Sequence, residues 1–133
     1  MRFLNTEHEN KLMDLIQRDG THPKDKERIS LFYILSGNAD LFAKSDAIYD
    51  FRNHQIEPEC LLDGRVDFCS SSKALIRLGY NLYNGYQDDM TTPLDILSGL
   101  DDDNYLLALE SLDIRLGYSK QVQSALDDEE LEL

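Results

Sequence analysis

The residues best suited to chemistry gather in one short stretch of the chain, from Asp50 to Cys69. These twenty residues hold both cysteines of the sequence, one of its three histidines and several carboxylates. Thiolate, imidazole and carboxylate groups are the protein ligands of zinc, and a structural zinc site uses four of them. The stretch therefore indicates a zinc site, a reactive thiol, a disulfide or a chance grouping of unconnected side chains.

We predict one structural zinc ion bound by Asp50, His54, Cys60 and Cys69. On a helix through Asp50, the side chain of His54 would lie four residues on and on the same face. A short loop would then return the two thiols to that face, and metal binding would supply folding energy to a stretch with a small core. The spacing H-x5-C-x8-C matches no common zinc finger, and His22 is an alternative fourth ligand in place of Asp50.

Two other interpretations of this stretch stay open. Cys69 stands directly before Ser70-Ser71-Ser72, where a helix begins, and a helix N-terminus lowers the pKa of a thiol. A zinc hydrolase would also need a general base, for which Glu57 and Glu59 are equal candidates. The plainest interpretation is two buried, inert cysteines and a surface histidine.

The wider sequence predicts a mainly α fold, a compact bundle of five to six helices with an irregular insertion near 54–70. The insertion has room for a two-stranded element, because Arg65 to Phe68 alternate weakly between polar and apolar. Apolar periodicity, caps and stop signals predict helices over about 6–19, 23–36, 39–53 (broken near Ser45), 70–84, 94–100 and 102–116.

Two of these helices have informative apolar patterns. The run from Ile29 to Leu35 is nearly continuous, so this helix should be central. The last helix carries one apolar side, made of Tyr105, Leu106, Leu109, Leu112 and Leu116. We expect one globular domain over 1–118 and an acidic tail over 119–133 that is a short helix or disordered.

The net charge of −13 is concentrated at the C-terminal end of the chain. Residues 87–133 hold 13 acids against two bases, Arg115 and Lys120. Such a surface repels nucleic acid and attracts a basic protein surface. We expect a partner of that kind, no direct binding of nucleic acid and none to a membrane. The predicted contact residues are Tyr86, Asp88, Asp89, Asp101, Asp102 and Asp103.

The sequence disfavours a calcium-binding loop at the acidic residues and a disulfide between the thiols. An EF-hand that starts at Asp101 would need glycine at its sixth position, where this chain has Leu106. A disulfide is disfavoured, because the sequence has no signal peptide or apolar span and we therefore expect a cytoplasmic protein. Cytoplasmic thiols stay reduced.

Phrases of the sequence are similar to those of an uncharacterised family of small proteins from low-GC Gram-positive bacteria, their phages and mobile elements. The likeness covers residues 1–118 and is carried by THPKDKERISLFYILSGNADLF, IYDFRNHQIEPECL, VDFCSSSKALIRLGYNLYNGY and PLDILSGLDDDNYLLALESLDIRLG. A small acidic protein of that provenance also resembles the anti-CRISPR proteins that block type II nucleases such as Cas9. The resemblance implies a bacterial host cytoplasm, and no residue role transfers, because those inhibitors share no motif.

Taken together, these features favour a non-enzymatic inhibitor or interaction protein whose acidic surface binds a basic nucleic-acid enzyme. The most specific form of this hypothesis is an anti-CRISPR protein that blocks DNA loading by Cas9. The alternatives are a zinc- or thiol-dependent enzyme built on residues 50–69, and a housekeeping or antitoxin-like interaction module.

Overall fold

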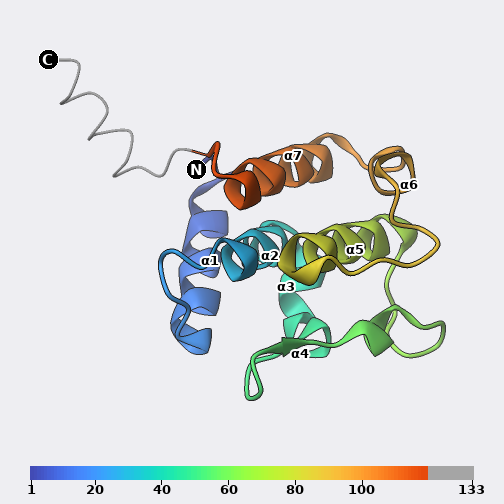
Figure 1. Ribbon diagram of the computed structural model, residues 1–133, viewed down its shortest axis with the longest axis horizontal. Helices are drawn as coiled ribbons and strands as arrows, with labels where there is room; N and C mark the ends of the chain where they lie inside the picture. Colours follow the sequence, from blue (N-terminus) through green and yellow to red (C-terminus); the bar gives the residue numbers. More distant parts are fainter. Residues whose placement is uncertain (120–133) are drawn as a thin grey trace, which may run out of the picture.

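The computed structural model describes residues 1–119, and within them the chain folds into α-helices packed around one buried helix (Figure 1). The seven α-helices of this part are α1 (Thr6–Asp19), α2 (Lys26–Gly37), α3 (Ala39–Ala43), α4 (Ser45–Ile48), α5 (Ser70–Asn84), α6 (Pro93–Leu97) and α7 (Asp102–Leu116). A short antiparallel sheet of β1 (Tyr49–Asp50) and β2 (Gln55–Ile56) and a 3-10 helix, η1 (Pro58–Leu61), lie between α4 and α5. The predicted mainly α fold with a small two-stranded element is confirmed. The predicted acidic tail lies outside the described residues, apart from Ser119.

Helix α2 is the centre of the bundle, as its apolar run predicts. Every side chain from Ile29 to Ser36 is buried, because α1, α3, α5 and α7 pack around it. The approach of α5 depends on Gly79, where a Cβ atom would lie 2.7 Å from Cδ1 of Leu31. Such a contact is too close for any larger residue without a shift of Leu31.

The middle of the chain departs from the predicted helix over 39–53. Helix α3 ends at Ala43, and α4 ends at Ile48. The backbone becomes extended at the next residue, Tyr49, which pairs with Ile56 in the sheet. The hairpin therefore begins before the predicted insertion, and residues 51–54 form its turn. The strand predicted for Arg65 to Phe68 is wrong, since these residues form turns and irregular backbone.

The ends of the long helices follow the predicted stop signals. Gly85 and Gly117 follow α5 and α7 with φ of 81° and 85°, a left-handed conformation that glycine adopts without strain. Asp101 caps α7 by accepting a hydrogen bond of 2.9 Å from the backbone N–H of Asn104. Among residues 1–119, no helix has the length and apolar content to span a membrane.

Candidate functional site

Asp50 and His54, two of the four predicted zinc ligands, lie at opposite ends of the hairpin turn. The Asp50 carboxylate accepts hydrogen bonds from the backbone N–H groups of Arg52 (2.9 Å) and Asn53 (3.1 Å) and from the Asn53 amide (2.7 Å). Donation from the Asn53 backbone and side chain holds the pKa of Asp50 below its usual value. His54 has a left-handed φ of 56°. The predicted placement of both residues on one helical face is therefore wrong.

The His54 ring contacts a carboxylate from another part of the chain. Its Nδ1 lies 2.7 Å from Oδ1 of Asp19, the last residue of α1. The Asp19 carboxylate also accepts hydrogen bonds from the hydroxyls of Tyr49 (2.9 Å) and Thr21 (2.6 Å). Burial by itself raises the pKa of Asp19, but these hydrogen bonds outweigh burial and hold the pKa below its ordinary value. The ionised carboxylate fixes the imidazole and leaves Nε2 for any further partner.

Arg28, in the first turns of α2, extends this network. Its Nε donates to the Tyr49 hydroxyl (3.0 Å), one terminal nitrogen donates to Asp25 (2.8 Å) and the other donates to the carbonyl of His54 (3.1 Å). The hydrogen bond to Tyr49 is the main reason that the pKa of Arg28 is raised. The guanidinium thus joins the start of α2 to the hairpin, and its donors are already committed within the chain.

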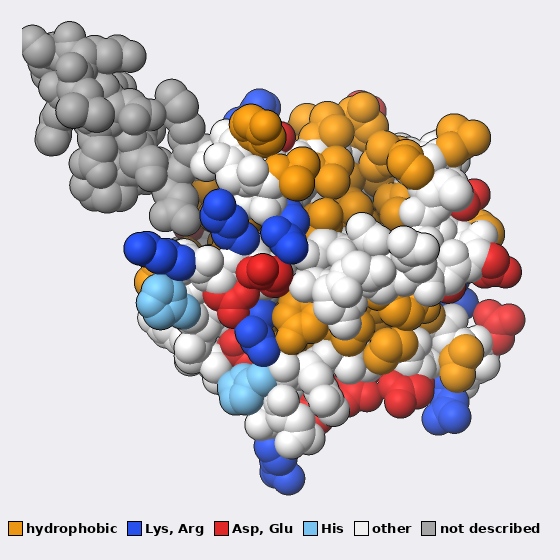
Figure 2. All heavy atoms as spheres, in the orientation of Figure 1, with side chains coloured by type: hydrophobic (Ala, Val, Ile, Leu, Met, Phe, Trp, Pro, Cys, Tyr) orange, Lys and Arg blue, Asp and Glu red, His pale blue; other side chains and the backbone are white. Residues whose placement is uncertain are grey.

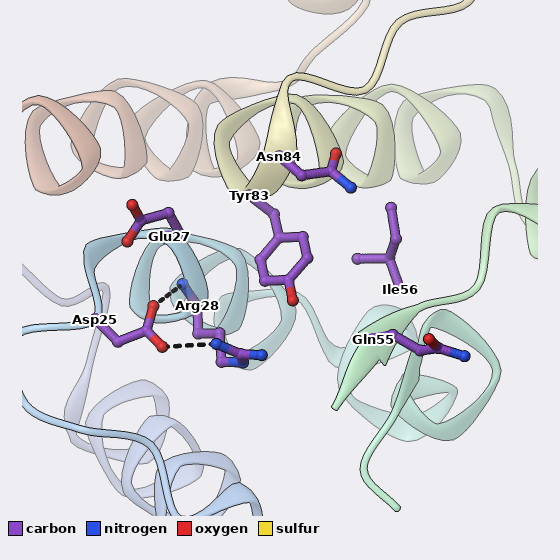
Figure 3. A pocket seen from close by; sticks show the side chains of 7 residues that line it. All are labelled: Asp25, Glu27, Arg28, Gln55, Ile56, Tyr83 and Asn84. Carbon is purple, nitrogen blue, oxygen red and sulfur yellow. Dashed lines mark hydrogen bonds and ion pairs between the residues drawn. The ribbon is translucent and has the colours of Figure 1, made fainter. Parts of the chain in front are cut away.

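A cavity of about 640 Å³ opens beside Arg28, between the start of α2, the end of α5 and strand β2 (Figure 3). Its lining is polar, with carboxylates from α2 and a tyrosine ring from α5: Asp25, Glu27, Arg28, Gln55, Ile56, Tyr83 and Asn84. Asp25 and Arg28 bind each other on the α2 side of the cavity (Figure 3). In the part of the chain described here, every buried polar side-chain atom has a hydrogen-bond partner.

Cys60 is a buried structural thiol. Its Sγ lies 3.3 Å from the hydroxyl of Tyr80, which in turn donates to the carbonyl of Ile48 at 2.6 Å. Burial raises the pKa of Cys60, so the thiol stays protonated at neutral pH. The side chain belongs to the contact between η1, α4 and α5.

Cys69 differs from Cys60 in exposure and in the direction of its pKa shift. It is exposed, occupies the N-cap of α5, and its Sγ lies 3.3 Å from the hydroxyl of Ser71 and 3.4 Å from that of Ser72. Hydrogen bonding with these two serines lowers the pKa of Cys69 to about 7. Both cysteines are free thiols.

The four predicted zinc ligands are therefore engaged with different neighbours. Across residues 1–119, no three His, Cys, Asp or Glu side chains come together as a metal ion would require. Zinc binding stays a prediction from the sequence, without a preformed ligand set in this arrangement.

Two of the predicted contact residues, Tyr86 and Asp88, bind within the chain. Asp88 accepts hydrogen bonds from Arg77 Nε (2.8 Å), from the Tyr86 hydroxyl (3.0 Å) and from the backbone N–H of Met90 (2.8 Å). Burial raises the pKa of Asp88, but these hydrogen bonds outweigh it, and the pKa lies below its usual value. Asp88 therefore holds the loop between α5 and α6 in shape.

The other four predicted contact residues are exposed. Asp89 lies in that loop, and Asp101, Asp102 and Asp103 lie at the start of α7. Two apolar side chains in the same region are also exposed, Met90 (46%) and Leu94 (76%). This end of the molecule therefore combines carboxylates with uncovered apolar surface.

The apolar side of α7 is largely directed to solvent. The residues that α7 buries are largely small or polar, namely Asn104, Leu107, Ala108, Glu110, Ser111 and Ile114. Four apolar residues on the other side are exposed, namely Tyr105, Leu106, Leu109 and Leu116. Figure 2 shows hydrophobic side chains gathered along α7 at the upper edge of the molecule.

The sequence did not indicate the roles of Asp19 and Arg28 or the exposed apolar side of α7. Asp19 and Arg28 occur in ordinary helical surroundings, and no local signal distinguishes them from surface charges. For α7, the alanine and serine at 108 and 111 were a usable signal, because small residues permit close helix packing.

Comparison with known proteins identifies a family but no characterised relative. A family described as a family of unknown function (DUF6075) matches residues 1–129 of the chain. No curated protein and no solved structure matches.

Proposed function

The chain belongs to the DUF6075 family, whose function is unknown, and we propose that it is a non-enzymatic protein that binds a basic protein surface. The observation that supports this most is the acidic end of the molecule, where Asp89 and the start of α7, Asp101 to Asp103, are exposed. Exposed Met90 and Leu94 in the same region supply the apolar component that a protein interface needs at its centre.

The partner class follows from charge. Residues 87–133 carry 13 acids and two bases, so a positively charged groove is the surface that gains most from contact with them. Enzymes that act on nucleic acids have such grooves, and an RNA-guided nuclease such as Cas9 grips its heteroduplex in one. The chain would act as an inhibitor that occupies the groove and prevents DNA loading.

The experiment is a binding and DNA-loading assay with purified Cas9 at increasing salt. We expect binding at low salt, loss of DNA loading in its presence, and weaker binding as screening increases. The triple variant Asp101→Asn, Asp102→Asn, Asp103→Asn keeps a capping side chain on α7 and should weaken binding at least tenfold.

A matched control removes three exposed acids from other parts of the surface: Asp14→Asn, Asp63→Asn and Asp67→Asn. The total charge change is the same, so this variant should bind nearly as well as the unaltered chain. If both triple variants weakened binding equally, the affinity would depend on net charge and not on the acidic residues at the start of α7. Absence of binding to Cas9 and to other basic nucleic-acid enzymes would overturn the proposal.

A second candidate function rests on Cys69. Its exposure and its pKa of about 7 are properties of a reactive thiol. Its hydrogen-bond partners are two serines, however, and an enzyme of this class also needs a base near the thiol. An activity screen and a binding assay with the Cys69→Ala variant separate the two candidates. A thiol enzyme should lose its activity, whereas an interaction protein should keep its affinity for its partner.

A further inference from the structure

The exposed apolar residues of α7 have the spacing of a helix-pairing seam. Tyr105, Leu109, Leu112 and Leu116 follow one another at intervals of four, three and four residues. This alternation is the one that keeps side chains on a single line facing a second helix. Tyr105, Leu109 and Leu116 are 43%, 38% and 64% exposed, and Leu112 is half-buried beside them.

The two ends of this seam carry opposite charges. Asp101, Asp102 and Asp103 are exposed at the N-terminal end of α7. At the C-terminal end lies Lys26, whose Nζ is 3.0 Å from the position of a Cβ on Gly117. Arg115 is also at this end, but its Nε donates to the carbonyl of Leu82 at 2.6 Å and a terminal nitrogen lies 3.7 Å from Glu27. Figure 2 shows basic side chains gathered near this end of α7 and acidic side chains around the opposite end of the molecule.

From these observations we infer that α7 pairs with α7 of a second copy of the chain in an antiparallel, two-fold symmetric dimer. A two-fold axis at the middle of the seam places Tyr105 of one copy at the level of Leu116 of the other, and Leu109 at the level of Leu112. Every seam residue then meets an apolar side chain.

The antiparallel orientation follows from the charges. At 100° per residue, Asp102 and Gly117 lie on one edge of the seam, and Asp101 and Arg115 lie on the other. An antiparallel pair brings the acidic end of each helix beside the basic end of the other, so Asp102 faces Lys26 across the first edge. A parallel pair would instead place Asp102 of one helix beside Asp101 of the other, so that like charges meet.

The dimer goes beyond the proposed binding of a basic protein and does not depend on it. The two would compete, because both use acidic residues at the start of α7. A helix of 15 residues is about 22 Å long, so the interface would fall at the small end of specific interfaces. We expect a dissociation constant on the order of micromolar.

The first measurement is the molar mass of the full chain by sedimentation velocity over a range of concentrations, without any partner present. We expect a reversible change from 15.3 kDa to twice that mass as the concentration increases. The Leu109→Asp variant should remain at 15.3 kDa, because it places a charge in the middle of the seam. The control Leu94→Asp alters a residue of 76% exposure outside the seam and should still dimerise.

The second measurement tests orientation by charge reversal. Asp102→Lys alone and Lys26→Asp alone should each weaken the dimer severalfold, and the double variant should recover the affinity of the unaltered chain. Circular dichroism confirms that each variant is folded. A chain that remains monomeric at millimolar concentration would overturn the inference. A dimer that Leu109→Asp leaves intact, or one that the double reversal does not restore, would also overturn it.

Discussion

The imidazole of His54 lies 2.7 Å from the carboxylate of Asp19, although the two residues are 35 positions apart in the chain. Asp19 ends α1 and is buried, while His54 ends the turn of the hairpin and is half exposed. The contact therefore ties the hairpin to the first helix, and Tyr49 and Arg28 connect the same carboxylate to the sheet and to α2. This network positions the hairpin that forms one wall of the cavity in Figure 3.

We expect that His54 and Asp19 stabilise the fold jointly. Asp19→Asn should lower the free energy of unfolding by about 1–3 kcal/mol, because a buried carboxylate with three donors is lost. Urea unfolding of Asp19→Asn, His54→Ala and the double variant should give a coupling energy of about 1 kcal/mol. Alanine is strained at the left-handed φ of His54, but that strain is common to both arms of the cycle and cancels.

A matched pair for this cycle is Asp19→Asn with His22→Ala, since His22 is exposed and accepts its hydrogen bond from Lys24 close by in the chain. That pair should show additive effects. Additive effects for His54 as well would mean that the contact with Asp19 contributes nothing to stability.

The stability of the fold should fall as pH decreases below neutral, because of His8. The His8 ring is buried, its Nδ1 accepts from the backbone N–H of Leu4 (3.2 Å) and its Nε2 donates to the carbonyl of Tyr33 (3.0 Å). Burial lowers the pKa of His8 below 6.5, so the folded chain holds this ring neutral. Below pH 6.5 the unfolded chain binds a proton that the folded chain does not, and stability decreases by up to about 1.4 kcal/mol per pH unit.

The measurement is urea unfolding between pH 5 and pH 8, with His8→Gln as the comparison. The variant should be less stable at pH 7.5 and should show a flatter dependence on pH. Parallel curves for the two proteins would assign the pH dependence to other groups.

The two cysteines should differ sharply in reactivity. Iodoacetamide should modify Cys69 in the folded protein with a pH midpoint near 7, which is the pKa that the serine hydrogen bonds confer. Cys60 should react only after unfolding, because it is buried and burial raises its pKa. Peptide mass spectrometry follows both sites, and Ser72→Ala should move the Cys69 midpoint upward. Comparable rates at the two thiols would contradict this arrangement.

The zinc prediction has a direct test that needs no assay of function. The four-ligand site predicted from the sequence requires about one zinc per molecule in chain purified without a metal column. The separate surroundings of His54, Cys60 and Cys69, if kept in solution, would give far less than one. The melting temperature of such a chain should not change with EDTA. One bound zinc that disappears in both Cys60→Ser and Cys69→Ser would instead support the four-ligand site predicted from the sequence.

Local signals predicted most of the helices. The caps and stops at Gly20, Gly85, Asp101 and Gly117 act within one turn of the backbone, and the structure has helix ends at each. The end of the third helical region at Ile48 was harder to predict from the sequence, because Tyr49 and Phe51 continue its apolar helical pattern. Pairing of Tyr49 with Ile56 overrides that pattern and turns the segment into a strand.

By itself, the sequence determined the helical class, the central position of α2 and the acidic character of the C-terminal third, because these depend on composition and on neighbours along the chain. Tertiary structure alone decided which side of α7 faces α2, which carboxylate meets His54 and how far apart the two thiols lie. Each of these depends on segments that are remote in sequence and come together only when the core packs. The small residues Ala108 and Ser111 allow α7 to lie close to the core, and the leucines on its other side are left in solvent.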